Sequence, residues 1–163
     1  MSMIGYLKMI DDTDLHHLDS DPTLVEDLID QDYAKHELLT VDKTWAALHF
    51  AIAGELYPDG DRLLSGAFVG QHIVDFDLEF GPPAFLFPEE VEKLSLKLEQ
   101  ISLADIEAAL RSERFKESDI YPFSEGDESE DEVVAYVLPY FDQVQAFYRL
   151  AAEKGKGVLI WIM

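Results

Sequence analysis

The spacing of apolar residues predicts helices along much of the chain. In residues 42–54, four side chains have the spacing of one helix face: Trp45, Leu48, His49 and Ile52. Asp42 is a favourable residue just before a helix, and Gly54 is a favourable residue just after one. The pattern therefore predicts a buried helix with His49 pointing inward.

Start signals predict further helices after Asp12, Asp21-Pro22, Pro88 and Ser102. Residues 133–153 are also helical in pattern, but Pro139 predicts an interruption there. The second half of that segment carries an aromatic stripe typical of a core face: Tyr140, Phe141, Val144, Phe147, Tyr148 and Ala151. We expect these helices to cover a sheet.

Three segments have the composition of strands. Residues 3–10 are rich in β-formers, with Gly5 at a point where another backbone may approach, and residues 157–163 form a continuous apolar run typical of a buried central strand. Residues 63–73 are apolar but broken by glycine, which favours a strand near a bend. Residues 57–60 predict a turn. Together these elements predict one compact α+β domain over residues 1–163, with a small mixed sheet that includes both terminal strands.

Composition narrows the function. The 163 residues contain 34 Asp and Glu against 12 Lys and Arg, a net charge of −22. Such a charge disfavours nucleic acid and anionic membranes as partners, and it fits either a basic protein partner or solubility alone. The absence of cysteine excludes disulfides and thiolate chemistry. Without an apolar run of membrane-spanning length or a signal-peptide pattern, we expect a soluble, cytoplasmic protein with no membrane partner.

Two segments contain residue types that can bind metal ions. His72, Asp75 and Asp77 are suitable ligand types, but an extended chain places only the two aspartates on one face. Residues 124–132 contain six acids without the ligand order of an EF-hand. We therefore expect no metal and no cofactor, and a solvated acidic loop at 124–132.

The order of short motifs resembles the YfbM-like family of small uncharacterised bacterial proteins, a domain of unknown function. The matching segments span nearly the whole chain: Met3-Ile4-Gly5, Asp42-Lys43-x-Trp45-x-x-Leu48-His49-Phe50, Gly81-Pro82, Pro88-Glu89-Glu90-Val91, Ile120-Tyr121-Pro122, Phe147-Tyr148-x-x-Ala151-Ala152 and Val158-Leu159-x-Trp161. The resemblance implies a compact α+β bacterial cytosolic domain and brings no established activity.

This chain departs from the family pattern at one point. Where the family tends to have an arginine and a tyrosine after Gly-Pro-Ala, this chain has Ala84 and Phe85, and Phe87 replaces the usual capping threonine. An anion site implied by the resemblance would lack its arginine here.

Two functions remain open. The first is a binding module, with the neutralisation of a basic protein as one such role. The second is a pocket for a small molecule or nucleotide, or an enzyme that uses His49 as acid or base. The residues expected to line such a pocket are His49, Trp45, Asp42, Gly81, Pro82 and Tyr121. The sequence leaves open whether the protein is an enzyme.

Overall fold

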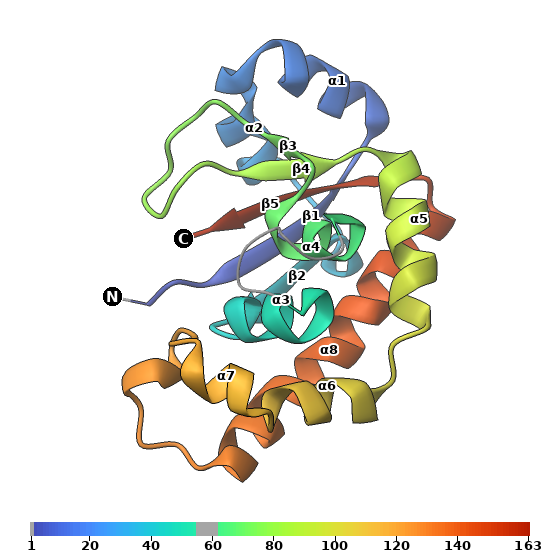
Figure 1. Cartoon of the computed structure of the whole chain (residues 1–163). Coiled ribbons are helices and arrows are strands. Elements are labelled where there is room, and N and C mark those ends of the chain that lie inside the picture. The colour runs from blue at the N-terminus through green and yellow to red at the C-terminus, as the bar shows by residue number, and fades with distance from the viewer. Residues whose placement is uncertain (1, 55–61) are drawn as a thin grey trace.

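A five-stranded sheet with the order β2-β1-β5-β4-β3 forms the middle of the molecule (Figure 1). The computed structural model describes residues 2–54 and 62–163. The strands are β1 (Gly5–Ile10), β2 (Leu38–Asp42), β3 (His72–Ile73), β4 (Ala84–Leu86) and β5 (Gly157–Ile162). The predicted central position of the C-terminal strand, next to the N-terminal one, is confirmed.

The expected mixed sheet is wrong, because every strand pair in the described residues is antiparallel. The apolar run of β5 is typical of a buried central strand, whether parallel or antiparallel. It is apolar because helices cover both of its faces, and this burial leaves no trace of strand direction in the sequence.

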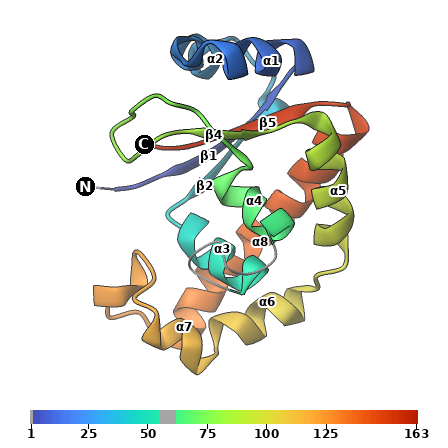
Figure 2. The same ribbon diagram turned by 45° about the horizontal axis from the view of Figure 1, so that its top comes forward.

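Alternating side chains of the central strands enter two cores. On β1, Leu7 and Met9 join a large core with α3–α8, whereas Ile10 joins a smaller core with α1 and α2. Figure 2 shows α1 (Asp12–Ser20) and α2 (Val25–Asp30) on one side of the sheet and the remaining α-helices on the other. A short 3₁₀ turn, η1 (Pro22–Leu24), joins α1 to α2, and η2 (Lys35–Glu37) precedes β2.

The larger layer contains α3 (Trp45–Ala53), α4 (Arg62–Val69), α5 (Pro88–Glu99), α6 (Leu103–Leu110), α7 (Glu113–Glu117), η3 (Phe123–Glu125) and α8 (Glu130–Glu153). The predicted starts at Pro88 and Ser102 are confirmed, and Ser102 forms the expected reciprocal cap with Asp105. In the predicted aromatic stripe of α8, Tyr140 is half-buried and the other five residues are buried.

Two local predictions are wrong, and one strand was not predicted. The expected strand at residues 63–73 is mostly α4, and β2 was not foreseen. The expected break at Pro139 does not occur, and α8 is continuous through it. Proline has no N–H group to donate to the carbonyl of Ala135, but Pro139 and Ala135 are both exposed, so water can bond that carbonyl. The predicted turn at 57–60 lies outside the described residues.

The backbone at Gly5 is closely approached, as its position suggested. A Cβ atom there would lie 2.8 Å from Cγ2 of Val41 and 3.0 Å from Cβ of Trp45. Only glycine therefore lets β1 pass this close to β2 and α3.

Candidate functional site

Trp45 and Tyr121, two of the predicted site residues, hold the N-terminal segment. The Trp45 indole N–H donates to the Met3 carbonyl at 3.0 Å, and the Met3 N–H donates to the Tyr121 hydroxyl at 3.0 Å. The two rings lie 6.1 Å apart, centroid to centroid. Both side chains thus have a clear structural role in fixing the start of β1.

Asp42 does not cap the helix as predicted. It ends β2 with a φ of 50°, and α3 begins later, at Trp45, after Thr44. Its carboxylate accepts a hydrogen bond of 2.5 Å from the Tyr136 hydroxyl. Burial, followed by this bond, raises the pKa of Tyr136, so Tyr136 stays protonated and donating. A non-glycine residue in this left-handed region is strained, and the Tyr136 bond helps to hold it there.

His49 points into the core, as the helical spacing predicted. It is 5% exposed, and its Nε2 atom has no hydrogen-bond partner in the described part of the chain. Burial lowers the pKa of its imidazole, which favours the neutral form. A group this enclosed does not meet solvent-borne substrate without a movement of α3 or its neighbours.

Gly81 and Pro82 lie apart from Asp42 in the fold. They belong to the connection between β3 and β4, at the edge of the sheet opposite β2. Gly81 has a φ of 106°, and its N–H donates to the Leu78 carbonyl at 3.2 Å. The six predicted residues therefore do not form one pocket. Trp45 and Tyr121 hold the N-terminal segment, an arrangement we call the N-terminal clamp, and Asp42 ends β2. His49 lies in the core, and the other two residues lie in a distant turn.

His72 makes a contact that the sequence pattern did not suggest. Its Nε2 lies 2.8 Å from Oε1 of Glu90, and its ring stacks on Phe85 at 5.0 Å. Glu90 also accepts from the Phe87 N–H, as the third residue of α5 does in a capping box. Among residues 2–54 and 62–163, no cluster of three or more His, Cys, Asp or Glu side chains could hold a metal ion.

A strongly acidic surface lies on α1, α2 and the residues beside them. Between Lys8 and Lys35 the sequence has no lysine or arginine. The same stretch has nine acids: Asp11, Asp12, Asp14, Asp19, Asp21, Glu26, Asp27, Asp30 and Asp32. We call this surface the acidic layer. It was not singled out by sequence reasoning, although the gap between the two lysines was visible there.

A groove of about 410 Å³ divides the acidic layer between α1 and α2. We call it the α1–α2 groove; it is lined by Asp14, His17, Leu24, Asp27, Leu28 and Gln31. Leu24 is half-buried and Leu28 is 8% exposed, so both contribute apolar surface, while each helix contributes one carboxylate. An apolar surface between two carboxylates can pack an aliphatic chain and pair with a cation at its end.

Lys8, a buried residue of β1, holds the end of α2 in place beside the groove. It is 2% exposed, and its ammonium donates to the carbonyls of Leu28, Ile29 and Gln31 at 2.8, 3.0 and 2.6 Å. These carbonyls are at the C-terminal end of α2, where a helix leaves acceptors without partners. Burial lowers the pKa of Lys8, whereas the charges of Asp30, Glu37 and Asp32 oppose that effect. Lys8 therefore positions α2, and with it one wall of the groove.

Comparisons with known proteins agree with this fold. The chain is 28% identical to Protein YfbM of Escherichia coli (strain K12) over 172 residues, which covers 100% of this chain and 99% of that protein. A crystal structure of YfbM from Escherichia coli, titled a protein of unknown function, has a similar fold, with a TM-score of 0.76, 24% identity and coverage of 98% and 99% of the two chains. Within the described residues, no helix is long and apolar enough to cross a membrane.

Residues 1–161 match the family described as "Domain of unknown function (DUF1877)". This match extends over almost the entire chain, as the order of short motifs suggested. The protein therefore belongs to this YfbM-like family of domains of unknown function.

Proposed function

We propose that the protein is a binding module that takes a lysine- or arginine-containing segment of a basic protein in the α1–α2 groove. The observation that carries the proposal is the combination of an apolar groove, a carboxylate from each helix, and a stretch of sequence between Lys8 and Lys35 that has no lysine or arginine. The aliphatic part of a lysine or arginine would pack on Leu24 and Leu28. Its cation would lie near Asp14 and Asp27.

Charge in the rest of the molecule supports this choice of surface. In the other helix layer, Arg111, Lys116 and Arg149 already pair with nearby carboxylates. In the acidic layer, Asp11 forms an ion pair with Lys156, which precedes β5 and is not part of the layer. A cationic partner would therefore find more uncompensated negative charge at the α1–α2 groove.

The test is a titration of a fluorescent peptide of lysine, arginine and alanine, followed by anisotropy. We expect binding at about 50 mM salt and an affinity at least tenfold weaker at about 500 mM, because salt screens exposed charges. A peptide with glutamate in place of the basic residues should not bind. Equal affinity at both salt concentrations would contradict the proposal.

A matched pair of variants separates the groove from net charge. Asp14→Asn combined with Asp27→Asn should weaken binding about tenfold, as expected for two partly exposed ion pairs. Glu92→Gln combined with Asp142→Asn makes the same change in net charge at exposed sites in the other helix layer, and should change affinity less than about twofold. Equal losses in the two double variants would assign the binding to overall charge and not to the groove.

The alternative that uses His49 stays a prediction. The Nε2 atom of His49, which has no hydrogen-bond partner in the described residues, favours this alternative. The 5% exposure of His49 argues against it. His49→Gln distinguishes a structural from a functional role. A fall in the melting temperature with unchanged ligand binding would indicate a structural core residue.

A further inference from the structure

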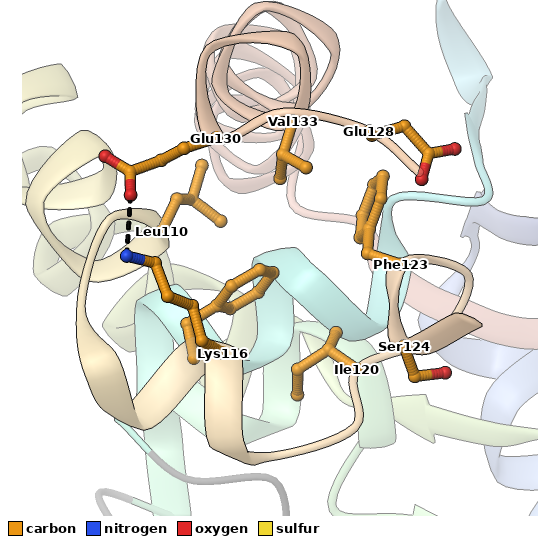
Figure 3. Close-up of a pocket in the computed structure, with 9 residues that line it drawn as sticks. Leu110, Lys116, Ile120, Phe123, Ser124, Glu128, Glu130 and Val133 are labelled. Carbon is orange, nitrogen blue, oxygen red and sulfur yellow. Dashed lines mark ion pairs between the residues drawn. The ribbon is translucent and has the colours of Figure 1, made fainter. Parts of the chain in front are cut away.

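A second cavity lies at the far end of the molecule, where α6, α7, η3 and the start of α8 meet. We call it the tip cavity; its volume is about 260 Å³. Its apolar walls are Leu110, Phe115, Ile120, Phe123 and Val133. Figure 3 shows Leu110, Ile120, Phe123 and Val133 around a common space. Leu110, Phe115, Ile120 and Val133 are each at most 6% exposed, so the interior is a fixed apolar surface.

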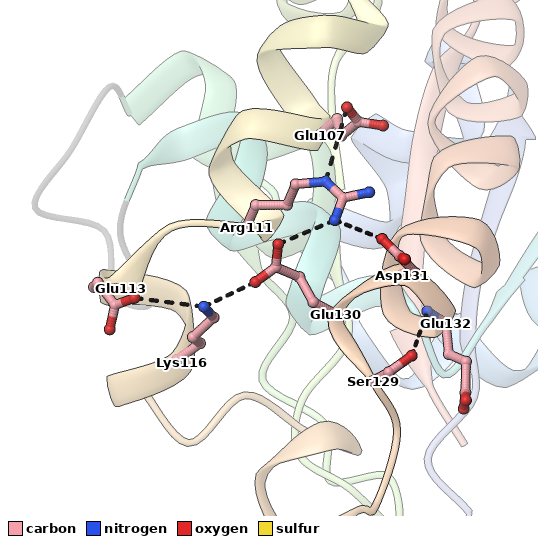
Figure 4. A network of polar contacts seen from close by, with 8 residues as sticks. All are labelled: Glu107, Arg111, Glu113, Lys116, Ser129, Glu130, Asp131 and Glu132. Atoms are coloured by element: carbon pink, nitrogen blue, oxygen red, sulfur yellow. Dashed lines mark hydrogen bonds and ion pairs between the residues drawn. The ribbon is translucent and has the colours of Figure 1, made fainter.

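One side of the tip cavity is closed by an ion pair. The Lys116 ammonium lies 2.8 Å from Oε2 of Glu130 and 3.4 Å from Oε1 of Glu113. Glu130 also pairs with Arg111 at 3.0 Å, so the four charges form one network (Figure 4). The hydrogen bond to Glu130 raises the pKa of Lys116, and the same bond lowers the pKa of Glu130. Both groups are therefore ionised at neutral pH, and the cation of Lys116 is already occupied.

The other side of the rim carries a carboxylate of a different kind. Glu128 is among the residues that line the tip cavity, and its carboxylate lies beyond Phe123, turned outward, so its exposed side chain must rotate to meet a ligand in the interior (Figure 3). Its side chain is exposed, and no lysine or arginine of the described residues forms an ion pair with it. The neighbouring sequence, residues 124–132, adds further acids and no base. Among the described residues that line the cavity, Glu128 is therefore the charged group without an ion-pair partner, and its charge is negative.

We propose that the tip cavity is a binding site for a small apolar amine. A single aromatic ring or branched aliphatic group would fill the apolar interior, and the ammonium would pair with Glu128. The size is suitable, because a smaller cavity of about 150 Å³ lined by Leu, Ile and Phe accepts benzene. An anionic ligand would have to displace Glu113 and Glu130 from Lys116 while lying close to Glu128.

This site is independent of the proposed function. The α1–α2 groove and the tip cavity share no lining residue and lie in different helix layers. A free amine is also chemically distinct from a basic protein segment, because most of its surface is apolar. Failure of one proposal leaves the other intact.

Three probes of similar size test the preference for a cation: 2-phenylethylamine, 2-phenylethanol and 3-phenylpropanoate. Binding is followed by protein-observed NMR at neutral pH. We expect the amine to bind with a Kd on the order of 1 mM, with shifts at the lining residues of the tip cavity. The alcohol should bind about threefold more weakly, and the carboxylate about tenfold more weakly. Absence of saturable shifts with the amine, equal affinities for amine and carboxylate, or shifts confined to other regions would overturn the proposal.

Two variants in one loop provide the matched control. Glu128→Gln should reduce amine affinity about threefold and leave the alcohol unchanged, because only the amine uses the carboxylate. Asp127→Asn changes the net charge equally, but Asp127 does not line the tip cavity and should leave both affinities unchanged. Both positions are exposed, so neither variant threatens folding. Equal losses in the two variants would overturn the role assigned to Glu128.

Discussion

The two acidic regions of this chain differ in how their charge is compensated. In the acidic layer, the sequence has nine acids in residues 11–32 and no local lysine or arginine. Residues 124–132 also contain six acids, but there Arg111 pairs with Glu130 and Asp131, and Lys116 pairs with Glu130. The comparison teaches that acidic composition alone does not identify a binding surface. The surface suited to a basic partner is the one whose charges the fold leaves uncompensated.

The largest expected effect comes from Lys8, the buried cation beneath the acidic layer. Lys8→Met leaves the carbonyls of Leu28, Ile29 and Gln31 without their shared donor. We expect the free energy of unfolding to fall by about 3 kcal/mol, because unsatisfied buried acceptors and a lost charged donor both cost stability. Urea denaturation measures it.

Lys35→Met is the control for this variant. It removes the same charge from an exposed position and should change the free energy of unfolding by less than about 0.5 kcal/mol. A similar loss in both variants would mean that net charge, and not the capping of α2, is what Lys8 provides.

A smaller effect is expected at Glu130, in the compensated region. Hydrogen bonds from Lys116 and Arg111 lower its pKa below the ordinary value of 4.5. A carboxylate with a lowered folded-state pKa contributes stability that is present above its unfolded pKa and is lost as the pH falls through its folded pKa. Glu130→Gln should therefore lower the free energy of unfolding at pH 7 by less than Lys8→Met does.

The pH dependence checks this reason. Urea unfolding at neutral pH should separate Glu130→Gln from the native protein, and the difference should shrink in acid, below about pH 4.5. A difference that is independent of pH would show that Glu130 acts through packing and not through its charge.

The smallest effect should have the opposite sign. Asp19 is exposed in the last turn of α1, where a negative charge meets the negative end of the helix dipole. We expect Asp19→Asn to raise the free energy of unfolding by about 0.3 kcal/mol. A thermal melt at low salt measures it, and the gain should vanish at high salt. A loss of stability would mean that the acidic layer is better compensated than its contacts show.

Most helices could be predicted because their apolar faces and caps are local features. Two helices were not predicted: the short α7, and α4, where Gly66 and Gly70 suggested a broken strand. In the fold, Gly66 lets the helix approach the sheet, since a Cβ atom there would lie 3.3 Å from Leu86, and Gly70 follows the helix end with a φ of 64°. A glycine needed for close packing is not distinguishable by sequence from one that breaks a strand.

The candidate sites were less predictable than the fold, because they depend on residues distant in sequence. The contact of His72 with Glu90 and the hydrogen bonds of Lys8 appear only when the chain is folded. The predicted set around His49 contained residues with distinctive side chains, and these serve the core and the N-terminal clamp. The α1–α2 groove could have been suspected only from the missing cations between Lys8 and Lys35.

The pairing of β1 with β5 has a consequence for how the protein avoids aggregation. These central strands lie almost a whole chain apart, so β1 and β4 keep open edges until β5 inserts between them. Open strand edges are templates for pairing with other copies. Because like charges repel, we expect the acids that follow β1 in the sequence to keep a second copy away during that interval, so that residues 11–32 also protect the unfinished sheet from aggregation.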